Sequence, residues 1–177
     1  GQDLDGLLSN YDFGRRRDAD PIRFAHAWPA GPDREVVAVF SALLSYGRAD
    51  LIGRAITDAT ARMGSAPAHA ARDDDVAAAT ERFADFVYRV TRGVDLTRVW
   101  LGLGAILRTH GSIGQALQTW DDDGQDMRGV MSRLRSEVVA ATSSFERRRG
   151  FEHFFPDPQR GSACKRLTRS GEHTSEL

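Results

Sequence analysis

Lys165 is the only lysine in the chain, whose other cationic side chains are all arginines, within a total of 24. A lysine amine can lose its proton and attack a carbonyl carbon to form a Schiff base, whereas an arginine guanidinium stays protonated and cannot. Lys165 is therefore a candidate nucleophile. The alternative is an ordinary solvated lysine near the start of a helix, where only its positive charge matters.

The residues before Lys165 predict a turn that leads into the first turn of a helix. Asp157-Pro158 favours a turn, and Gly161 can adopt a positive φ or allow another backbone to approach closely. Ser162 can then cap a helix that begins at Ala163. Such a helix start presents free N–H groups and partial positive charge, which bind phosphate. The side chains that would reinforce this anion site belong to Arg160, Lys165 and Arg166.

This region resembles the signature of an uncharacterised bacterial family, domain of unknown function 2400. The similar residues are Phe154-Phe155-Pro156-Asp157-Pro158 and Gly161-Ser162-Ala163-Cys164-Lys165-Arg166-Leu167. Earlier stretches are also similar to that family, namely Asp20-Pro21-Ile22-Arg23-Phe24, the helix from Phe40 to Arg48, Phe86-Val87-Tyr88-Arg89 and Gly93-Val94-Asp95-Leu96. The resemblance covers residues 1 to about 168.

That family in turn resembles helix-hairpin-helix DNA glycosylases of the endonuclease III type. Their hairpin contains a glycine followed four residues later by the Schiff-base lysine, which is the spacing of Gly161 and Lys165. The resemblance implies that Lys165 is catalytic. It also implies that a basic hairpin binds DNA through Arg160, Gly161, Ser162, Ala163 and Arg166.

Residues 43–50 are similar to a helix and loop of the same glycosylases, and this similarity implies that Arg48 also contacts nucleic acid. In those enzymes a glutamine fills the hole left by the flipped base, whereas Gly47 stands in its place here, which argues against duplex opening by this loop. Glycosylases also need a carboxylate from the helix beyond the hairpin. In the family it resembles a Leu-Asp-Thr-His segment, and the chain as given ends before it, so we expect a catalytically incomplete chain.

Composition indicates one globular domain, with 41% hydrophobic and 28% charged residues and a net charge of −1. We expect a helical domain over residues 1–168, incomplete at both ends, and a non-native tail over 169–177. The apolar runs are too short to span a membrane, and one cysteine cannot form an internal disulfide, so a cytoplasmic protein is expected. Near-neutral charge means that any DNA contact must come from a local patch. The oligomeric state is left open.

Apolar spacing predicts an all-α fold, a single domain of about seven to nine helices. The expected helices cover residues 3–11, 34–46, 51–63, 76–91, 96–110, 112–119 and a long segment from Met127. Asp33, Asp50, Asp75 and Asp95 are expected to cap helices, and Gly47, Gly64 and Gly111 to end them. Residues 34–46 have almost no polar face, which predicts a central buried helix.

No cofactor or metal is expected. Asp121-Asp122-Asp123-Gly124 lacks the full series of calcium ligands, and a helix-capping loop is the better interpretation. The histidines are too scattered for metal-ligand spacing.

Three functions fit these observations. The first is a DNA glycosylase or lyase relative in base-excision repair, with Lys165 as nucleophile. The second is a non-catalytic nucleic-acid-binding or scaffolding module, in which Lys165 serves only as a charge. The third is a nucleotide or RNA enzyme on the same fold.

Overall fold

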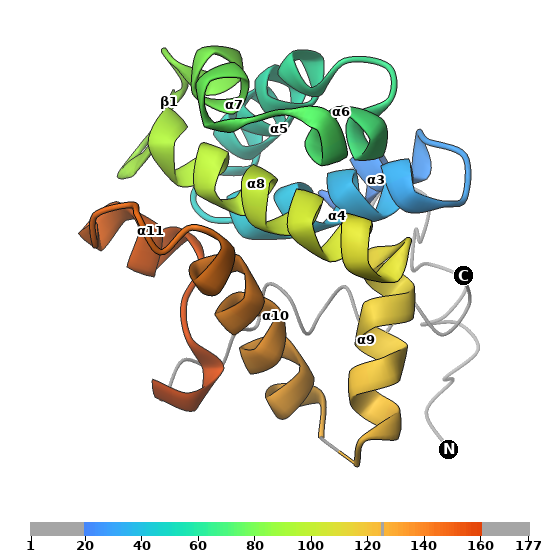
Figure 1. Ribbon diagram of the computed structural model, residues 1–177. Coiled ribbons are helices and arrows are strands. Elements are labelled where there is room, and N and C mark those ends of the chain that lie inside the picture. Colours follow the sequence, from blue (N-terminus) through green and yellow to red (C-terminus); the bar gives the residue numbers. More distant parts are fainter. Residues whose placement is uncertain (1–19, 125, 161–177) are drawn as a thin grey trace, which may run out of the picture.

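The computed structural model describes residues 20–124 and 126–160, which form a helical domain with one short hairpin, as the all-α prediction expects (Figure 1). The predicted helix over residues 3–11 and the predicted tail over 169–177 lie outside these ranges. The helices are α3 (Ile22–His26), α4 (Pro32–Leu44), α5 (Ala49–Met63), α6 (Pro67–Asp73), α7 (Val76–Phe83), α8 (Gly93–His110), α9 (Ile113–Asp122), α10 (Met127–Ala141) and α11 (Arg149–Phe154). Strands β1 (Val87–Tyr88) and β2 (Thr91–Arg92) form the hairpin, and η1 (Pro158–Arg160) is a 3-10 turn.

Helix α8 runs through the middle of the domain, with α6 and α7 packed on one side and α10 on the other (Figure 1). Two glycines allow this close packing. A Cβ at Gly102 would lie 2.6 Å from the Cα of Val138 in α10, and a Cβ at Gly104 would clash with the Ala71 carbonyl of α6. Larger side chains at these positions would therefore separate the helices.

The predicted central buried helix is α4, and this prediction is confirmed. Its almost completely buried apolar residues are Val36, Val37, Phe40, Leu43 and Leu44. The Phe40 ring stacks on Phe83 at 6.1 Å and meets the edge of Trp100 at 6.2 Å, which ties α4 to α7 and α8. The helix ends at Leu44, before Tyr46 and Gly47, so the chain leaves α4 earlier than predicted.

Three of the four predicted caps, Asp33, Asp50 and Asp95, are wrong because the helices begin earlier than these aspartates. Asp33 lies in the first turn of α4, where its carboxylate accepts the Ala68 N–H of α6 at 2.8 Å. Asp50 lies in the first turn of α5, whose N-cap is Arg48. Asp75 does cap α7, by accepting the Ala78 N–H at 2.9 Å.

The helix predicted over residues 76–91 is wrong beyond Phe83, where α7 ends. The chain turns into the hairpin instead, with Val87 paired to Arg92 and Tyr88 to Thr91. Val87 and Val90 are 63% and 52% exposed. The segment is rich in β-branched and aromatic residues, which favour a strand.

Two boundaries in the second half of the domain, the start of α8 and the end of α9, also differ from the predictions, whereas α10 begins at Met127 as predicted. Helix α8 begins at Gly93, so Asp95 is its third residue and not its cap, and Gly111 ends it with φ +80° as predicted. Helix α9 continues through Asp121 and Asp122, so the acidic run is largely the end of a helix. Asp126 then caps α10 by accepting the Gly129 N–H at 2.8 Å.

Candidate nucleic-acid interface

The predicted site segment begins where the structural description stops. Asp157-Pro158 turns the chain after α11, and Arg160 is the last residue of η1. Gly161, Ser162, Ala163, Lys165 and Arg166 lie outside the described residues, so the predicted basic hairpin and its lysine stay predictions.

The chain that leads into this segment is fixed against α10 by two arginines. Arg135 donates from Nε to the Phe155 carbonyl at 2.9 Å and forms an ion pair with Glu152 at 2.6 Å. Nη1 of Arg135 lies 3.8 Å from the Asp157 carboxylate, which also accepts the Gln159 N–H. Arg128 donates to the Pro158 carbonyl at 3.0 Å. Residues 155–159 are therefore held in one place on the domain.

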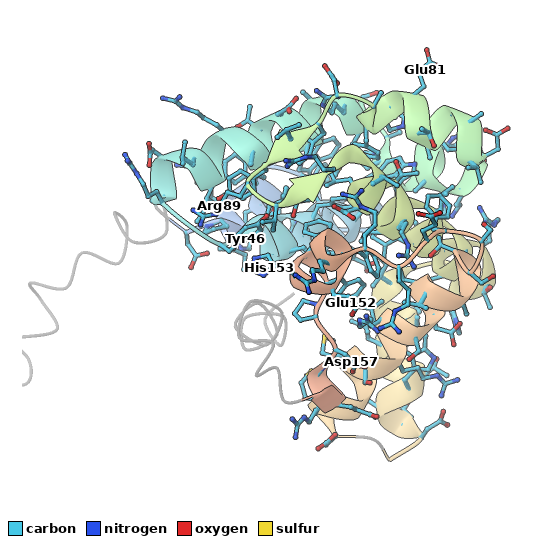
Figure 2. The ribbon with its side chains drawn as sticks, turned by 90° about the vertical axis from the view of Figure 1, so that its left-hand side faces the viewer. Tyr46, Glu81, Arg89, Glu152, His153 and Asp157 are labelled. Atoms are coloured by element: carbon cyan, nitrogen blue, oxygen red, sulfur yellow. The ribbon has the colours of Figure 1, made fainter. Side chains whose placement is uncertain are left out.

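Three segments far apart in the chain meet beside this lead-in, around the side chain of Tyr46. The Tyr46 hydroxyl donates to the Tyr88 carbonyl at 3.1 Å and lies 2.7 Å from the Thr91 hydroxyl, while the Tyr88 hydroxyl donates back to the Tyr46 carbonyl. His153 of α11 meets the edge of the Tyr46 ring at 4.9 Å. Figure 2 shows Arg89, Tyr46 and His153 in succession along one side of the molecule.

Burial raises the pKa of the Tyr88 hydroxyl, and the nearby Tyr46 raises it further. Tyr88 therefore stays neutral at physiological pH and keeps the proton that it donates to Tyr46. The reciprocal bonds fasten the loop after α4 to the hairpin. These hydrogen bonds hold the loop and the hairpin in fixed positions relative to each other.

Gly47 lies directly beneath the hairpin, with φ +109°. A Cβ there would lie 3.0 Å from the Tyr88 hydroxyl oxygen and 3.3 Å from Nη1 of Arg89. The glycine is needed both for its backbone angle and for the close approach of these side chains. The space beside this loop is thus occupied by Arg89 from another segment.

Exposed arginines lie on the three segments that meet at this aromatic cluster. Arg48 follows Gly47 and is 78% exposed, paired only with the half-exposed Asp50 at 3.2 Å. The others come from the hairpin and from the start of α11. We call the five together the arginine face: Arg48, Arg89, Arg92, Arg147 and Arg149. Its ion pairs are those of Arg48 with Asp50 and of Arg147 with Glu152, and the exposed Glu146 precedes Arg147 in the chain.

A buried carboxylate joins the two halves of the arginine face. Asp95 has no exposed surface, and it accepts the Arg92 N–H at 2.9 Å and Nε of Arg148 at 3.3 Å. A Cβ at Gly150 would come within 2.8 Å of the same carboxylate, so the start of α11 packs against it. Arg148 is therefore the ion-pair partner of a buried carboxylate, although its own side chain is 41% exposed and lies between Arg147 and Arg149 in the sequence.

Of the predicted nucleic-acid-binding residues, the structure places Arg48 on this face and the backbone of Arg160 at the end of the α10-bound lead-in. Sequence reasoning did not single out Tyr46, Arg89, Asp95 or His153 as parts of one site. The one feature that these four residues share in the sequence is that each lies in or next to a stretch that resembles the family. Neither the helical spacing of apolar residues nor the helix-capping residues predicts that these four residues lie close together.

A family model described as protein of unknown function (DUF2400) matches residues 20–169. The chain belongs to this family. The match includes the arginine face, the α10-bound lead-in and the predicted hairpin with Lys165. No curated protein and no solved structure matches the chain.

Residues 20–124 and 126–160 are the part of the chain that the structure describes. There, no group of three or more histidine, cysteine, aspartate or glutamate side chains could hold a metal ion. No helix among the same residues is both long enough and apolar enough to cross a membrane.

Proposed function

We propose that this protein binds DNA through the arginine face and acts on it as a glycosylase- or lyase-like enzyme of base-excision repair. The observation that supports binding is that three distant segments, which meet at one aromatic cluster, carry five exposed arginines. Phosphate contacts from arginine supply most of the affinity for nucleic acid. A locally cationic surface on a chain of net charge −1 is the patch that such binding requires.

The proposed chemistry uses Lys165. In its neutral form the lysine Nζ attacks C1′ of an abasic site in the open-chain aldehyde form, and loss of water leaves an imine. Borohydride reduces that imine to a stable secondary amine, which links protein and DNA covalently. The bonds to α10 hold residues 155–159, which come shortly before Lys165 in the sequence.

The second candidate is a non-catalytic nucleic-acid-binding or scaffolding module. The five arginines of the arginine face belong to segments other than the one that contains Lys165. They could therefore bind phosphate without the lysine, which favours this candidate. In this case Lys165 contributes a charge alone.

Replacing Lys165 separates the two candidates. We expect the protein to be trapped by borohydride on a duplex with an abasic site, and Lys165→Arg to abolish trapping while leaving DNA binding intact, because guanidinium cannot form the imine. Lys165→Gln should also abolish trapping and should reduce the salt slope of binding by about one unit. The measurements are denaturing gels after borohydride and binding titrations at several salt concentrations.

Two results would count against catalysis by Lys165. Trapping that survives Lys165→Arg would exclude this residue as the nucleophile. Binding of DNA without any trapping by the unaltered protein would favour the non-catalytic module. A protein that neither binds nor is trapped would exclude both candidates.

A further inference from the structure

The β1–β2 hairpin combines a fixed base with an exposed tip. Its register places Tyr88 and Thr91 on the buried face, bonded to Tyr46, and Val87 and Arg92 on the opposite, exposed face. The two turn residues between the strands, Arg89 and Val90, are also exposed. The tip therefore presents two valines and two arginines to solvent.

The hairpin exposes two apolar side chains close together. In the described part of the chain, the well-exposed large apolar residues are Val76, Val87, Val90 and Met127. Two of the four lie in this hairpin. They are next to Arg89, whose φ of +53° is a left-handed conformation that non-glycine residues rarely adopt. An exposed apolar tip on a strained, anchored turn suggests a contact surface.

The charges around the tip identify the kind of partner. Arg48 follows Gly47, which lies against Tyr88 and Arg89 of the hairpin. Arg149 precedes Gly150, which lies against the Val90 carbonyl and the Asp95 carboxylate. The partner must offer anionic groups on both flanks and an apolar surface between them. Duplex nucleic acid offers phosphates on both strands and stacked bases between them.

We propose that the Arg89-Val90 tip inserts into a DNA duplex at a weakened base step, while the arginine face holds the flanking phosphates. This inference rests on the proposed DNA binding and adds how the protein selects its site. Apolar side chains that enter between base steps unstack them, and unstacking costs least where a base is unpaired or missing. The hairpin thus favours duplexes with an abasic or mismatched position over fully paired ones.

The test compares two fluorescent duplexes of one length, fully paired or with one tetrahydrofuran abasic analogue beside a 2-aminopurine. The hairpin variants are Val90→Ser and Arg89→Asn, since asparagine tolerates a positive φ and removes the charge. The matched controls are Val76→Ser, an exposed valine of α7, and Arg133→Gln, an arginine paired with Asp123 and Glu137. Thermal melting checks that all the variants are folded.

We expect the unaltered protein to bind the abasic duplex about tenfold more tightly than the paired one and to raise 2-aminopurine fluorescence as the step unstacks. Val90→Ser should abolish most of that preference and the fluorescence rise, while its affinity for the paired duplex stays within about twofold. Arg89→Asn should reduce the preference and also weaken binding to both duplexes. The controls should behave as the unaltered protein.

Three outcomes would overturn the inference. If the hairpin variants weaken binding to both duplexes equally, the tip only contacts phosphate, and DNA binding by the arginine face still stands. If Val90→Ser releases the protein from phosphatidylserine vesicles without changing DNA binding, the tip is a membrane contact. If the unaltered protein binds neither duplex, the proposed function falls together with the inference.

Discussion

At the scale of single residues, three consecutive arginines have different tasks. Arg148 donates to the fully buried Asp95, Arg147 forms a long exposed pair with Glu152 at 3.5 Å, and Arg149 is exposed at the first position of α11. A run of like residues in a sequence usually indicates a solvated surface. Here the middle residue is structural, because Asp95 would otherwise be an unpaired buried charge.

The stabilities of single variants should therefore differ within this run. Arg148→Gln should lower the free energy of unfolding by about 1–3 kcal/mol, because it leaves the Asp95 carboxylate without its ion pair. Arg147→Gln should change it by less than about 0.5 kcal/mol, as expected for an exposed pair. Asp95→Ala should cost about 2–4 kcal/mol, since the Arg92 N–H and the Arg148 guanidinium both lose their acceptor.

Urea unfolding followed by circular dichroism measures these differences. Equal stabilities for the Arg147 and Arg148 variants would show that Asp95 does not depend on Arg148.

At the scale of elements, Asp74 connects three helices just after α6. It accepts hydrogen bonds from Arg82 of α7 at 2.7 and 3.0 Å and from the indole N–H of Trp100 in α8 at 2.8 Å. Arg82 also donates to the Arg62 carbonyl of α5 at 2.8 Å. The joint is polar at its centre and lies beside the apolar contact of Phe83 with Trp100.

This joint should make part of the stability depend on pH. Burial acts to raise the pKa of Asp74, but the hydrogen bonds from Arg82 and Trp100 outweigh it, so the pKa lies below its ordinary value. A carboxyl group with a lowered pKa in the folded state stabilises the fold fully above its unfolded pKa of about 3.9, and this contribution is lost as the pH falls through the folded value. Asp74→Asn should thus cost about 1–3 kcal/mol near pH 7, and the difference from the unaltered protein should shrink below about pH 4.

Unfolding free energies of the two proteins between pH 7 and pH 3 check this expectation. A difference that stays constant down to pH 3 would mean that the Asp74 charge does not contribute.

Helices with an apolar stripe could be predicted from the sequence, and the hairpin could not, for physical reasons. In α4 the apolar residues recur with the helical period, so the buried element was correctly expected over residues 34–46. Two-residue hairpin loops can normally be recognised in a sequence by Asn-Gly or a similar pair. Here Arg89 and Val90 form the loop, and Arg89 takes the positive φ without that signal. Tertiary contacts of Tyr88 and Thr91 with Tyr46 hold it in place.

The candidate site, like the fold, could be predicted from the sequence only in part. Arg48 was expected to contact nucleic acid because residues 43–50 resemble a glycosylase loop, and the structure places it on the arginine face. The aromatic cluster was not predictable, because it joins Tyr46, Tyr88 and His153 across more of the chain than any local pattern spans. Asp95 was expected at a helix start, but its ion pair with Arg148 depends on the packing of α11.

At the scale of the whole molecule, the fold brings together three segments that carry exposed arginines. Helix α8 places Asp95 where the hairpin and the start of α11 meet, and α10 holds residues 155–159. In Figure 1 the hairpin and α11 lie at the same end of α8. The proposed attraction to nucleic acid depends on these arginines and should weaken with salt.

The most direct test of this account is the salt dependence of DNA binding by the arginine face. Fluorescence anisotropy should give a linear fall of log K with log salt, and the double variant Arg48→Gln/Arg149→Gln should reduce that slope by about two units. Arg133→Gln, whose guanidinium is already paired with Asp123 and Glu137, should leave the slope unchanged. A double variant that binds DNA with the slope of the unaltered protein would contradict the account, because the arginine face would then not hold phosphates.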